Sequence, residues 1–295
     1  MDILQEFTSY IHQIGYSKGS QYQIPNCIKE FLGQVTEPNI KKINQQDIID
    51  FYQYLQTRPL KRRTGALSEA MIGHYVFSLK TFFNWLEQTG QIKYNPISNI
   101  RFKSPQGNPR EPLSQEEIGQ LFEAAQTSKE TAILHLFYSC GLRRTEAENL
   151  NTSDIHFSKN LLFVREGKGA KRRAIPVNEK VKNELESYYT DERTKVGSLS
   201  RDTGKEACLP DRQAFMLNKT NRRMRGDSYN RGLKKIIERT EIDKETTLHH
   251  LRHSIATHLL ENGLGIEFVR DFLGHSHLEA TQIYAKVPHR LLKKL

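Results

Sequence analysis

Apolar residues recur at helical spacing through the first hundred residues. The pattern predicts helices over residues 2–15, 18–33 and 68–87, and a further helix that begins after Asn44-Gln-Gln-Asp47. Large apolar side chains line one face of the helix at 68–87, at Ile72, Tyr75, Val76, Leu79, Phe82, Phe83 and Leu86. We expect the four helices to pack as a compact bundle, with these aromatics in its core rather than exposed to stack on nucleotide bases.

A change of composition marks the end of this bundle. Lys103 to Pro112 reads KSPQGNPREP, a run of proline, glycine and polar residues that is typical of an exposed linker. Ser114-Gln-Glu-Glu117 then forms a capping-box pattern, which predicts that a new helix and a new domain begin there. We therefore expect one domain at residues 1–104, a linker at 105–112 and a second domain at 113–295.

Helical periodicity continues in the second domain. One predicted helix ends at Cys140-Gly141, where glycine favours the left-handed conformation that stops a helix. The next begins after Leu142 and runs through Leu150. Arg143 is therefore expected at a helix N-terminus, where Glu146, three residues on, can orient its guanidinium. The alternative is a generic surface arginine.

A pair of predicted strands interrupts the helices. Residues 161–177 are expected to form two strands around a turn, with Lys168 between two glycines at its tip. Residues 178–190 and 228–239 are predicted to be helices, and residues 215–217 a short strand. The fold class is therefore mainly α with a small antiparallel β-sheet.

Charge then indicates the kind of partner. The chain has 44 Lys and Arg against 34 Asp and Glu, a net charge of +10 and a pI near 9.4. The excess is uneven, because residues 51–110 hold nine basic and two acidic residues whereas residues 1–50 hold four and six. Release of condensed counterions favours nucleic acid as the partner of such a surface. The alternative is a merely basic soluble protein.

Short basic runs are the candidates for contact with DNA phosphates. They are Lys61, Arg62 and Arg63 in a predicted loop, Lys171, Arg172 and Arg173 in the predicted hairpin, and Arg222 and Arg223 before a predicted helix. The alternative for each run is an ordinary solvated basic segment.

Cysteine usage and hydropathy indicate the cellular location and argue against a zinc site. The three cysteines lie far apart, and no Cys-x-x-Cys pair or Cys/His cluster suggests a zinc site. The odd count argues against a disulfide framework, so we expect a cytoplasmic protein that is nucleoid-associated when it is bound to DNA. No apolar run approaches the length of a membrane span. No metal ion or other cofactor is predicted.

The most concentrated chemistry lies in residues 248–286. This stretch holds His249, Arg252, His275 and Tyr284, a set suited to chemistry on a phosphate. Guanidiniums bind phosphate oxygens in planar, bidentate geometry, imidazoles transfer protons near neutral pH, and a tyrosine hydroxyl can act as a nucleophile. His249 and Arg252 are three residues apart and share one face if they lie on a helix.

Together these motifs resemble the tyrosine recombinases, also called phage-type integrases, over essentially the whole chain. The resemblance rests on five motifs in order, namely Gly141-Leu-Arg143-Arg-Thr-Glu146, the hairpin with Lys168, His249-His-Leu-Arg252, Leu273-Gly-His275, and Tyr284. Each motif is weak alone, whereas five in this order are highly specific. Because the chain starts directly at the helical domain, the layout looks most like the simpler Xer-like branch.

The resemblance implies a role for each motif residue. Arg143 and Arg252 would clamp the scissile phosphate, Lys168 would help to protonate the leaving 5′ oxygen, and Tyr284 would form a 3′-phosphotyrosine link. His249 and His275 match the two positions that assist proton transfer. Glu146 matches a supporting acidic position.

The resemblance also implies an architecture and an activity. The helical domain would be a core-binding domain that, with a mixed α/β catalytic domain, forms a C-shaped clamp around double-stranded DNA. The protein would be a site-specific recombinase that assembles as a tetramer on two sites and needs neither metal nor ATP. Free of DNA it would be monomeric or weakly associated.

Two other functions remain open on the same scaffold. One is a non-catalytic, sequence-specific DNA-binding regulator, and the other is DNA relaxation of the type IB topoisomerase kind. The sequence does not give the target site or the need for an accessory protein. Only eleven residues follow Tyr284, and whether this short tail docks in cis or in trans is also open.

Overall fold

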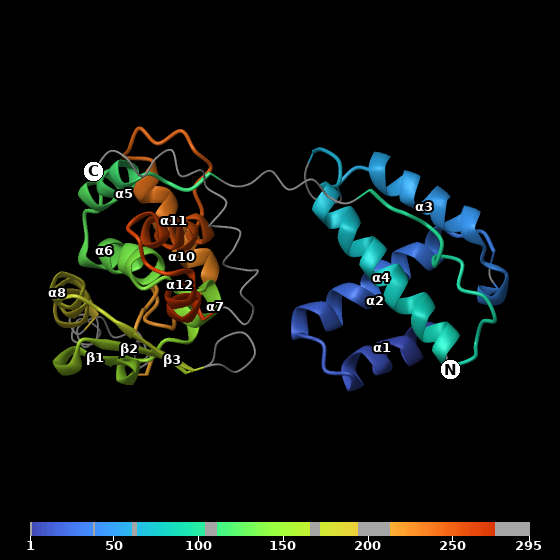
Figure 1. Ribbon diagram of the computed structural model, residues 1–295, viewed down its shortest axis with the longest axis horizontal. Helices are drawn as coiled ribbons and strands as arrows, with labels where there is room; N and C mark the ends of the chain where they lie inside the picture. Colours follow the sequence, from blue (N-terminus) through green and yellow to red (C-terminus); the bar gives the residue numbers. More distant parts are fainter. Residues whose placement is uncertain are drawn as a thin grey trace, which may run out of the picture. The chain divides into compact units, whose positions relative to one another are not determined.

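The structure, a computed structural model, describes residues 2–37, 39–60, 64–103, 111–165, 172–193 and 213–274. The chain divides into two compact units, Met1–Pro109 and Arg110–Leu295, each with its own hydrophobic core (Figure 1). The predicted fold class, mainly α with a small antiparallel sheet, is confirmed. The roles assigned to the two domains stay predictions at this stage.

The first unit contains the four predicted helices. They are α1 (Ile3–Gln13), α2 (Lys18–Gln34), α3 (Gln45–Thr57) and α4 (Glu69–Gln88), with a short 3₁₀ turn, η1 (Ile40–Lys42), before α3. Each helix begins where a polar side chain accepts a backbone N–H of the first turn, at Asp2, Ser17, Asn44 and Ser68. Local sequence therefore fixes the start of every helix in this unit.

Aromatic side chains form the core of the first unit. Phe7, Phe31, Phe82 and Phe83 are completely buried. Phe7 meets Phe82 edge to face with ring centroids 4.9 Å apart, and Phe31 meets Phe83 in the same way at 5.8 Å. Each buried ring removes a large apolar area from water. The prediction that the aromatics of α4 are core residues is confirmed for Tyr75, Phe82 and Phe83.

A buried ion pair fixes the end of α3 to α2 and α4. Arg58 Nε lies 2.9 Å from Glu30 Oε1, and the Tyr75 hydroxyl donates to Glu30 Oε2 at 2.8 Å while it accepts from Arg58 Nη2 at 2.9 Å. Burial, reinforced by Glu30, raises the pKa of Tyr75 to about 12, so the phenol stays protonated. Lys61, Arg62 and Arg63, which follow Arg58, lie outside the described residues.

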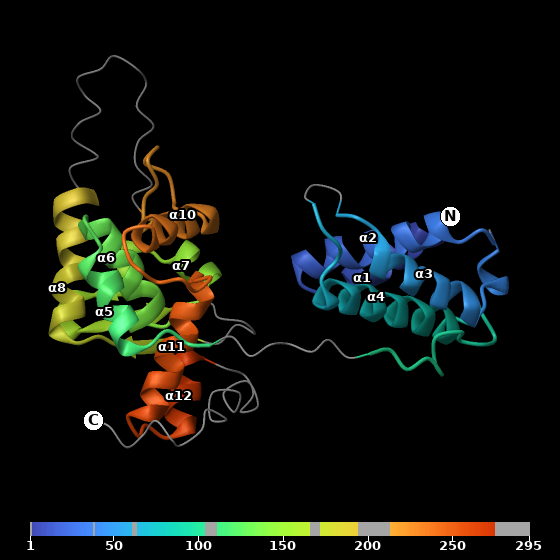
Figure 2. The ribbon, with the colours of Figure 1, turned by 90° about the horizontal axis from the view of Figure 1, so that it is seen from above.

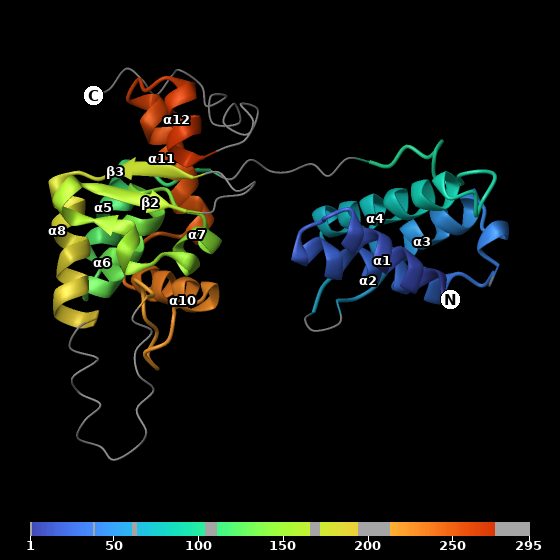
Figure 3. The ribbon, with the colours of Figure 1, turned by 90° about the horizontal axis from the view of Figure 1, so that it is seen from below.

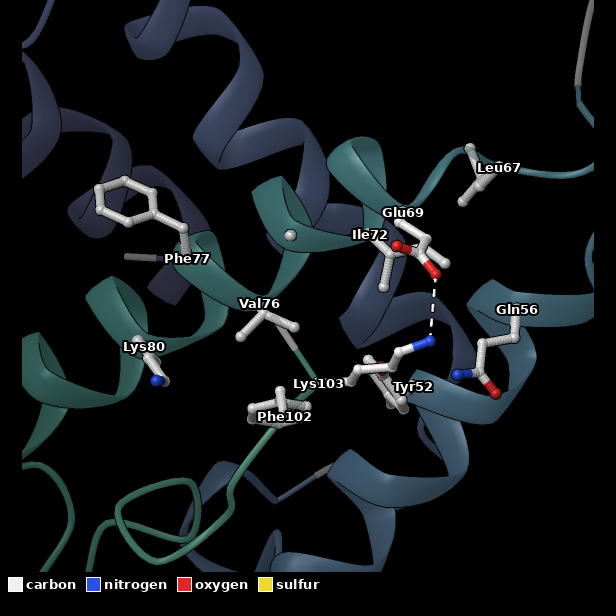
Figure 4. Close-up of a pocket in the computed structure, with 11 residues that line it drawn as sticks. Tyr52, Gln56, Leu67, Glu69, Ile72, Val76, Phe77, Lys80, Phe102 and Lys103 are labelled. Carbon is white, nitrogen blue, oxygen red and sulfur yellow. Dashed lines mark hydrogen bonds and ion pairs between the residues drawn. The ribbon is translucent and has the colours of Figure 1, made fainter. Parts of the chain in front are cut away.

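The chain leaves the first unit along a groove beside α3 and α4. Phe102 lies against Tyr52 with ring centroids 5.1 Å apart, and the Lys80 ammonium lies 5.9 Å from the Phe102 ring centroid (Figure 4). Lys103 forms an exposed ion pair with Glu69 at 3.4 Å, drawn as a dashed line in Figure 4. Contacts of aromatic and aliphatic surface thus hold this exit segment, with little help from the exposed charges.

The second unit begins with a series of helices that precede a three-stranded sheet. They are α5 (Gln115–Glu123), α6 (Ser128–Leu134), its π-helical continuation η2 (His135–Ser139) and α7 (Arg144–Asn149), followed by the 3₁₀ turn η3 (Thr152–Asp154). Later elements are α8 (Glu179–Ser187), its π-helical extension η5 (Tyr188–Arg193), α10 (Gly226–Ile237), α11 (Leu248–Glu261) and α12 (Ile266–Leu273). The capping box predicted at Ser114 is confirmed.

The sheet has the order β1-β2-β3 and is antiparallel throughout. Its strands are β1 (Ile155–His156), β2 (Leu161–Val164) and β3 (Arg173–Pro176), with a 3₁₀ turn, η4 (Phe157–Lys159), between the first two. Leu162 pairs with Ile155 and Ile175, and all three side chains point into the core. The two strands of the predicted hairpin are confirmed, and the turn with Lys168 lies outside the described residues. Strand β1 was not predicted because two residues give no alternating pattern.

The sheet is covered by helices on one face and bounded by α12. Figure 3 shows the strands in front of α5 and α6, with α12 beside β3, and Figure 2 shows α5, α6, α8 and α10 from the opposite side. The strand predicted at residues 215–217 is wrong. Phe215 and Met216 are buried, but this segment makes only isolated bridges, at Ala214 and Leu217, rather than a ladder. A short apolar run indicates that its residues are buried, but it does not by itself specify a strand.

We predict that loss of the buried charge in the first unit is far more costly than loss of an exposed one. Arg58→Ala removes the guanidinium that lies 2.9 Å from the largely buried Glu30 carboxylate and is expected to lower the free energy of unfolding by about 3 to 5 kcal/mol. Trp85 is the one tryptophan and lies in this core. Its fluorescence during urea unfolding of the full chain therefore reports on this unit.

The matched control is Lys103→Ala. Lys103 and Glu69 are exposed, so its removal should cost less than about 1 kcal/mol. Equal losses for the two variants would contradict a stabilising role for the Glu30–Arg58 pair.

Candidate active site

The site begins at the turn between η2 and α7. Gly141 has a φ of +56°, as predicted for a left-handed helix stop, and a Cβ there would lie 2.9 Å from Leu273 Cδ2. Both the backbone conformation and the close approach of α12 therefore require glycine. Arg143 follows as the N-cap of α7, the predicted position. Its backbone N–H donates to Glu146 Oε2 and its Nη1 donates to Glu146 Oε1, each at 2.8 Å.

Glu146 is the centre of a cluster of three arginines. Besides Arg143 it accepts two hydrogen bonds from Arg173 of β3, from Nη1 at 3.0 Å and from Nη2 at 2.8 Å. Arg252 of α11 brings its Nη1 to 3.9 Å from the same carboxylate. The Glu146 side chain is only 1% exposed. Residues that are far apart in the sequence thus meet on one buried carboxylate.

The electrostatics of Glu146 follow from these contacts. Burial by itself raises the pKa of a carboxyl group, but the hydrogen bonds and charge of Arg173, and then those of Arg143, outweigh it. The pKa of Glu146 falls to about 2, so the group is ionised at neutral pH. A buried carboxylate with these partners holds the guanidiniums in fixed positions.

The C-terminal end of α12 closes the cluster from the other side. The Phe272 carbonyl accepts from Arg173 Nε at 2.9 Å, and the Leu273 carbonyl accepts from Arg252 Nη2 at 2.7 Å. The Gly274 carbonyl accepts from Arg143 Nη2 at 2.9 Å. The last carbonyls of a helix lack partners within the helix and carry partial negative charge. Three arginines therefore satisfy the end of α12.

Gly274 allows this close approach. Its φ is +64°, and a Cβ there would lie 2.8 Å from Arg173 Nη1. Any side chain would push the guanidinium away, so glycine is required on both counts. The next residue in the chain is His275, which together with Tyr284 lies outside the described residues.

The first turn of α11 presents the histidine pair. His249 is exposed and Arg252, one turn on, is 2% exposed and donates to the Gly141 carbonyl. His250 instead turns back on the helix start, where its Nδ1 accepts from Thr247 N at 3.1 Å and lies 2.9 Å from Thr247 Oγ1. Of the two adjacent imidazoles, that of His250 is thus engaged at the helix cap, whereas His249 is exposed.

The other predicted residues fall into two groups. Arg172 and Arg222 are exposed, whereas Arg223 donates to the carbonyls of Glu148 and Leu150, at 3.0 and 3.2 Å, and to Asn151 Oδ1 at 2.7 Å. Arg223 thus holds the end of α7 in place. Lys168 and Lys171 lie outside the described residues.

Arg173 has a place that the sequence analysis did not give it. It was grouped with Arg172 as a DNA contact, but its side chain is 8% exposed and points at Glu146 and α12. Strand alternation is the signal that could have separated them, because Arg173 and the buried Ile175 share a face of β3. The carbonyls of α12 gave no sequence signal at all.

The described residues have neither a metal-binding cluster nor a membrane-spanning helix. They contain no group of three or more His, Cys, Asp and Glu side chains arranged to hold a metal ion. They also contain no helix long and apolar enough to cross a membrane.

Comparison with known proteins identifies the family. Residues 111–290 match the phage integrase family. A tyrosine recombinase of Thermosipho africanus is 30% identical over 290 residues, which cover 97% of this chain and 95% of that protein. Tyrosine recombinase XerD of Oceanobacillus iheyensis is 33% identical over 260 residues, 86% of this chain and 81% of that protein.

Solved structures agree on the fold. The crystal structure of XerA recombinase is 25% identical, with a TM-score of 0.53, and the match covers 99% of this chain and 95% of that one. A lambda integrase dimer bound to a COC′ core site is 16% identical, with a TM-score of 0.75, over 99% and 79% of the two chains. The chain thus belongs to the phage integrase family and is a Xer-like tyrosine recombinase, an enzyme of site-specific recombination.

Ionisation of Glu146 predicts a specific dependence of stability on pH. Its folded pKa of about 2 lies below the ordinary value of 4.5, so its contribution is complete above about pH 5 and is lost as the pH falls towards 2. The shift corresponds to about 3 kcal/mol. We expect Glu146→Gln to be less stable than the natural protein by about this amount at pH 7, in urea unfolding followed by circular dichroism. The difference should shrink towards pH 2, and a constant difference would contradict this account.

Arg173 of β3 and the preceding residue, Arg172, give a second prediction. Arg173→Ala breaks a buried ion pair and is expected to lower the free energy of unfolding by about 3 to 5 kcal/mol. Arg172→Ala removes an exposed side chain and should change it by no more than about 0.5 kcal/mol. The same urea unfolding experiment measures both. Equal effects would show that Arg173 is not part of the buried cluster.

Proposed function

We propose that this recombinase cleaves and rejoins double-stranded DNA through Tyr284, with Arg143 and Arg252 holding the reacting phosphate. The observation that carries the proposal is the meeting of the two guanidiniums at the end of α12, immediately before His275 in the chain. Tyr284 follows nine residues later. The five motifs of the sequence, in order, support the same assignment.

The charge of the arginine cluster suits a phosphodiester. Arg143, Arg173 and Arg252 carry three positive charges and Glu146 one negative charge, so two positive charges remain unneutralised in the cluster. A phosphodiester is anionic and repels an incoming nucleophile. Positive charge fixed in advance attracts the phosphate and stabilises the further negative charge that develops in the transition state.

Arg143 is the arginine best placed to meet DNA. Its side chain is 21% exposed, compared with 3% for Arg252. Nη1 and Nη2 are engaged by Glu146, Leu273 and Gly274, whereas Nε has no hydrogen-bond partner among the described residues. A planar guanidinium fixed on one edge can present its other edge to two phosphate oxygens, which the ammonium of lysine cannot imitate.

The remaining groups would transfer the protons. The Tyr284 hydroxyl, with an ordinary pKa of about 10, must lose its proton as its oxygen attacks phosphorus. His249 and His275 would accept or relay that proton, and Lys168 would give a proton to the departing 5′ oxygen. The phosphorus–5′ oxygen bond breaks as the phosphorus–tyrosine bond forms. Attack by a 5′ hydroxyl reverses the step, so rejoining requires no ATP.

DNA is the proposed partner, and a tetramer is the proposed assembly. Exchange of strands between two duplexes requires four cleavages, so four active sites would act in one complex on two sites. Residues of the three basic runs are proposed to contact backbone phosphates. They are Lys61, Arg62 and Arg63 in the first run, Lys171 and Arg172 in the second, and Arg222 in the third. The two domains would close on the duplex as a clamp.

The proposal predicts a covalent protein–DNA adduct. Sites of attachment would first be mapped in cells, by recovering DNA that stays covalently bound to the denatured protein. A nicked suicide substrate that contains the recovered site should then trap the protein, with Tyr284 bonded to the 3′ phosphate of the cleaved DNA strand. Tyr284→Phe should form no adduct, and an adduct that persists in this variant would refute the assignment of the nucleophile.

Arg143→Lys supplies the companion measurement. It should reduce the rate of adduct formation by at least about a hundredfold, a typical loss for one oriented donor in the transition state, with much smaller loss of affinity for DNA. Binding without an adduct in the natural protein, under any condition, would instead favour the non-catalytic regulator. Relaxation of supercoiled DNA without paired sites would favour the topoisomerase.

A further inference from the structure

A basic pocket, separate from the arginine cluster around Glu146, lies in the second unit. It is formed by α6, the turn at residues 218–220 and α10. Its volume is about 480 Å³, and four cationic side chains line it, those of Lys129, Lys219, Arg231 and Lys235. Thr220 and Ser228 add hydroxyl groups to the lining. None of these residues belongs to the cluster around Glu146.

One face of α10 lines this pocket. Ser228, Arg231, Gly232 and Lys235 recur at helical spacing and all line it. Tyr229, Leu233 and Ile236 occupy the other face and are completely or almost completely buried in the core. Lys234, the immediate neighbour of Lys235, does not line the pocket and instead lies 3.8 Å from Glu238. The two adjacent lysines thus have different surroundings.

The floor of the pocket is apolar. Ile133 of α6 and Met224 line it, and a Cβ on Gly232 would lie 2.8 Å from Ile133 Cδ1. The two helices therefore approach closely at Gly232. Cations with hydroxyls above an apolar floor match a phosphate ester whose sugar carbons rest on the floor.

Nearby acids do not cancel the positive charge. Glu130 also lines the pocket, but its carboxylate accepts from Arg239 at 2.7 and 3.1 Å. Glu192 accepts from Ser128 Oγ at 2.8 Å and from Lys129 N at 3.0 Å. Burial lowers the pKa of the Lys129 ammonium; Glu192 opposes this effect and Lys219 adds to it. A bound anion would relieve this repulsion between cations.

We propose that this pocket binds a backbone phosphate of the DNA duplex, away from the phosphate that reacts. The inference rests on the proposed function, because it extends the DNA surface of the same unit. Helix α10 connects the two places. A Cβ on Gly226, at its start, would lie 2.5 Å from Arg144 Cδ, and Arg144 follows Arg143 in the chain. A phosphate held by α10 therefore fixes the duplex relative to the reacting arginines.

The adjacent lysines of α10 provide the test. Binding of the full chain to a fluorescent duplex of arbitrary sequence is measured by anisotropy across a range of salt concentrations. Arg231→Ala and Lys235→Ala should each lower the slope of log affinity against log salt by about 0.9, equivalent to about an eightfold loss of affinity at 0.1 M salt. Lys234→Ala should change neither. All three side chains are exposed, and thermal unfolding checks that the variants fold.

The outcomes separate the possible conclusions. Equal loss for Lys234→Ala and Lys235→Ala, or no loss for Lys235→Ala and Arg231→Ala, would overturn the pocket but leave the recombinase proposal intact. A natural protein that binds no duplex at all would remove both proposals. Calorimetric titration with a deoxynucleoside monophosphate tests the other source of phosphate. Tight binding that Lys235→Ala abolishes, with duplex affinity unchanged, would overturn the assignment to DNA backbone.

Discussion

The second unit depends on the Glu146 carboxylate. A buried charge is costly unless it is paired and hydrogen-bonded, and Glu146 meets that condition with Arg143 and Arg173 while Arg252 lies within 4 Å. The cost of burying these charges is offset only when all of them are in place. The carboxylate therefore fixes the relative positions of α7, β3 and α11, which carry the arginines. Loss of one member leaves the others with unsatisfied charge.

The carbonyl end of α12 adds a second constraint on the same cluster. Phe272, Leu273 and Gly274 give their carbonyl oxygens to the three arginines. The position of α12 is therefore coupled by hydrogen bonds to the arginines, two of which are proposed to hold the phosphate. Since the chain runs on from Gly274 to His275 and Tyr284, the arginine cluster also fixes the point from which the proposed nucleophile segment starts. The same hydrogen bonds therefore stabilise the fold of this unit and position the arginines that are proposed to bind the phosphate.

Much of the fold followed from local patterns. The helix starts at Asn44 and Ser114 and the left-handed stop at Gly141 are set by residues within one turn, so the sequence predicts them well. The prediction failed where an apolar run was too short to carry a period. β1 was missed, and residues 215–217 were assigned to a strand although they are buried without a ladder.

The sequence by itself determined which residue types are present, their order, and the local pairing of Arg143 with Glu146 three residues on. Only the tertiary structure decided that Arg173 joins that pair, because its partner lies 27 residues earlier and 2.8 Å away. The same holds for Arg252 and the end of α12. A one-dimensional pattern contains the periodicity of a single element, whereas the neighbours of a buried charge come from several elements that meet only after packing.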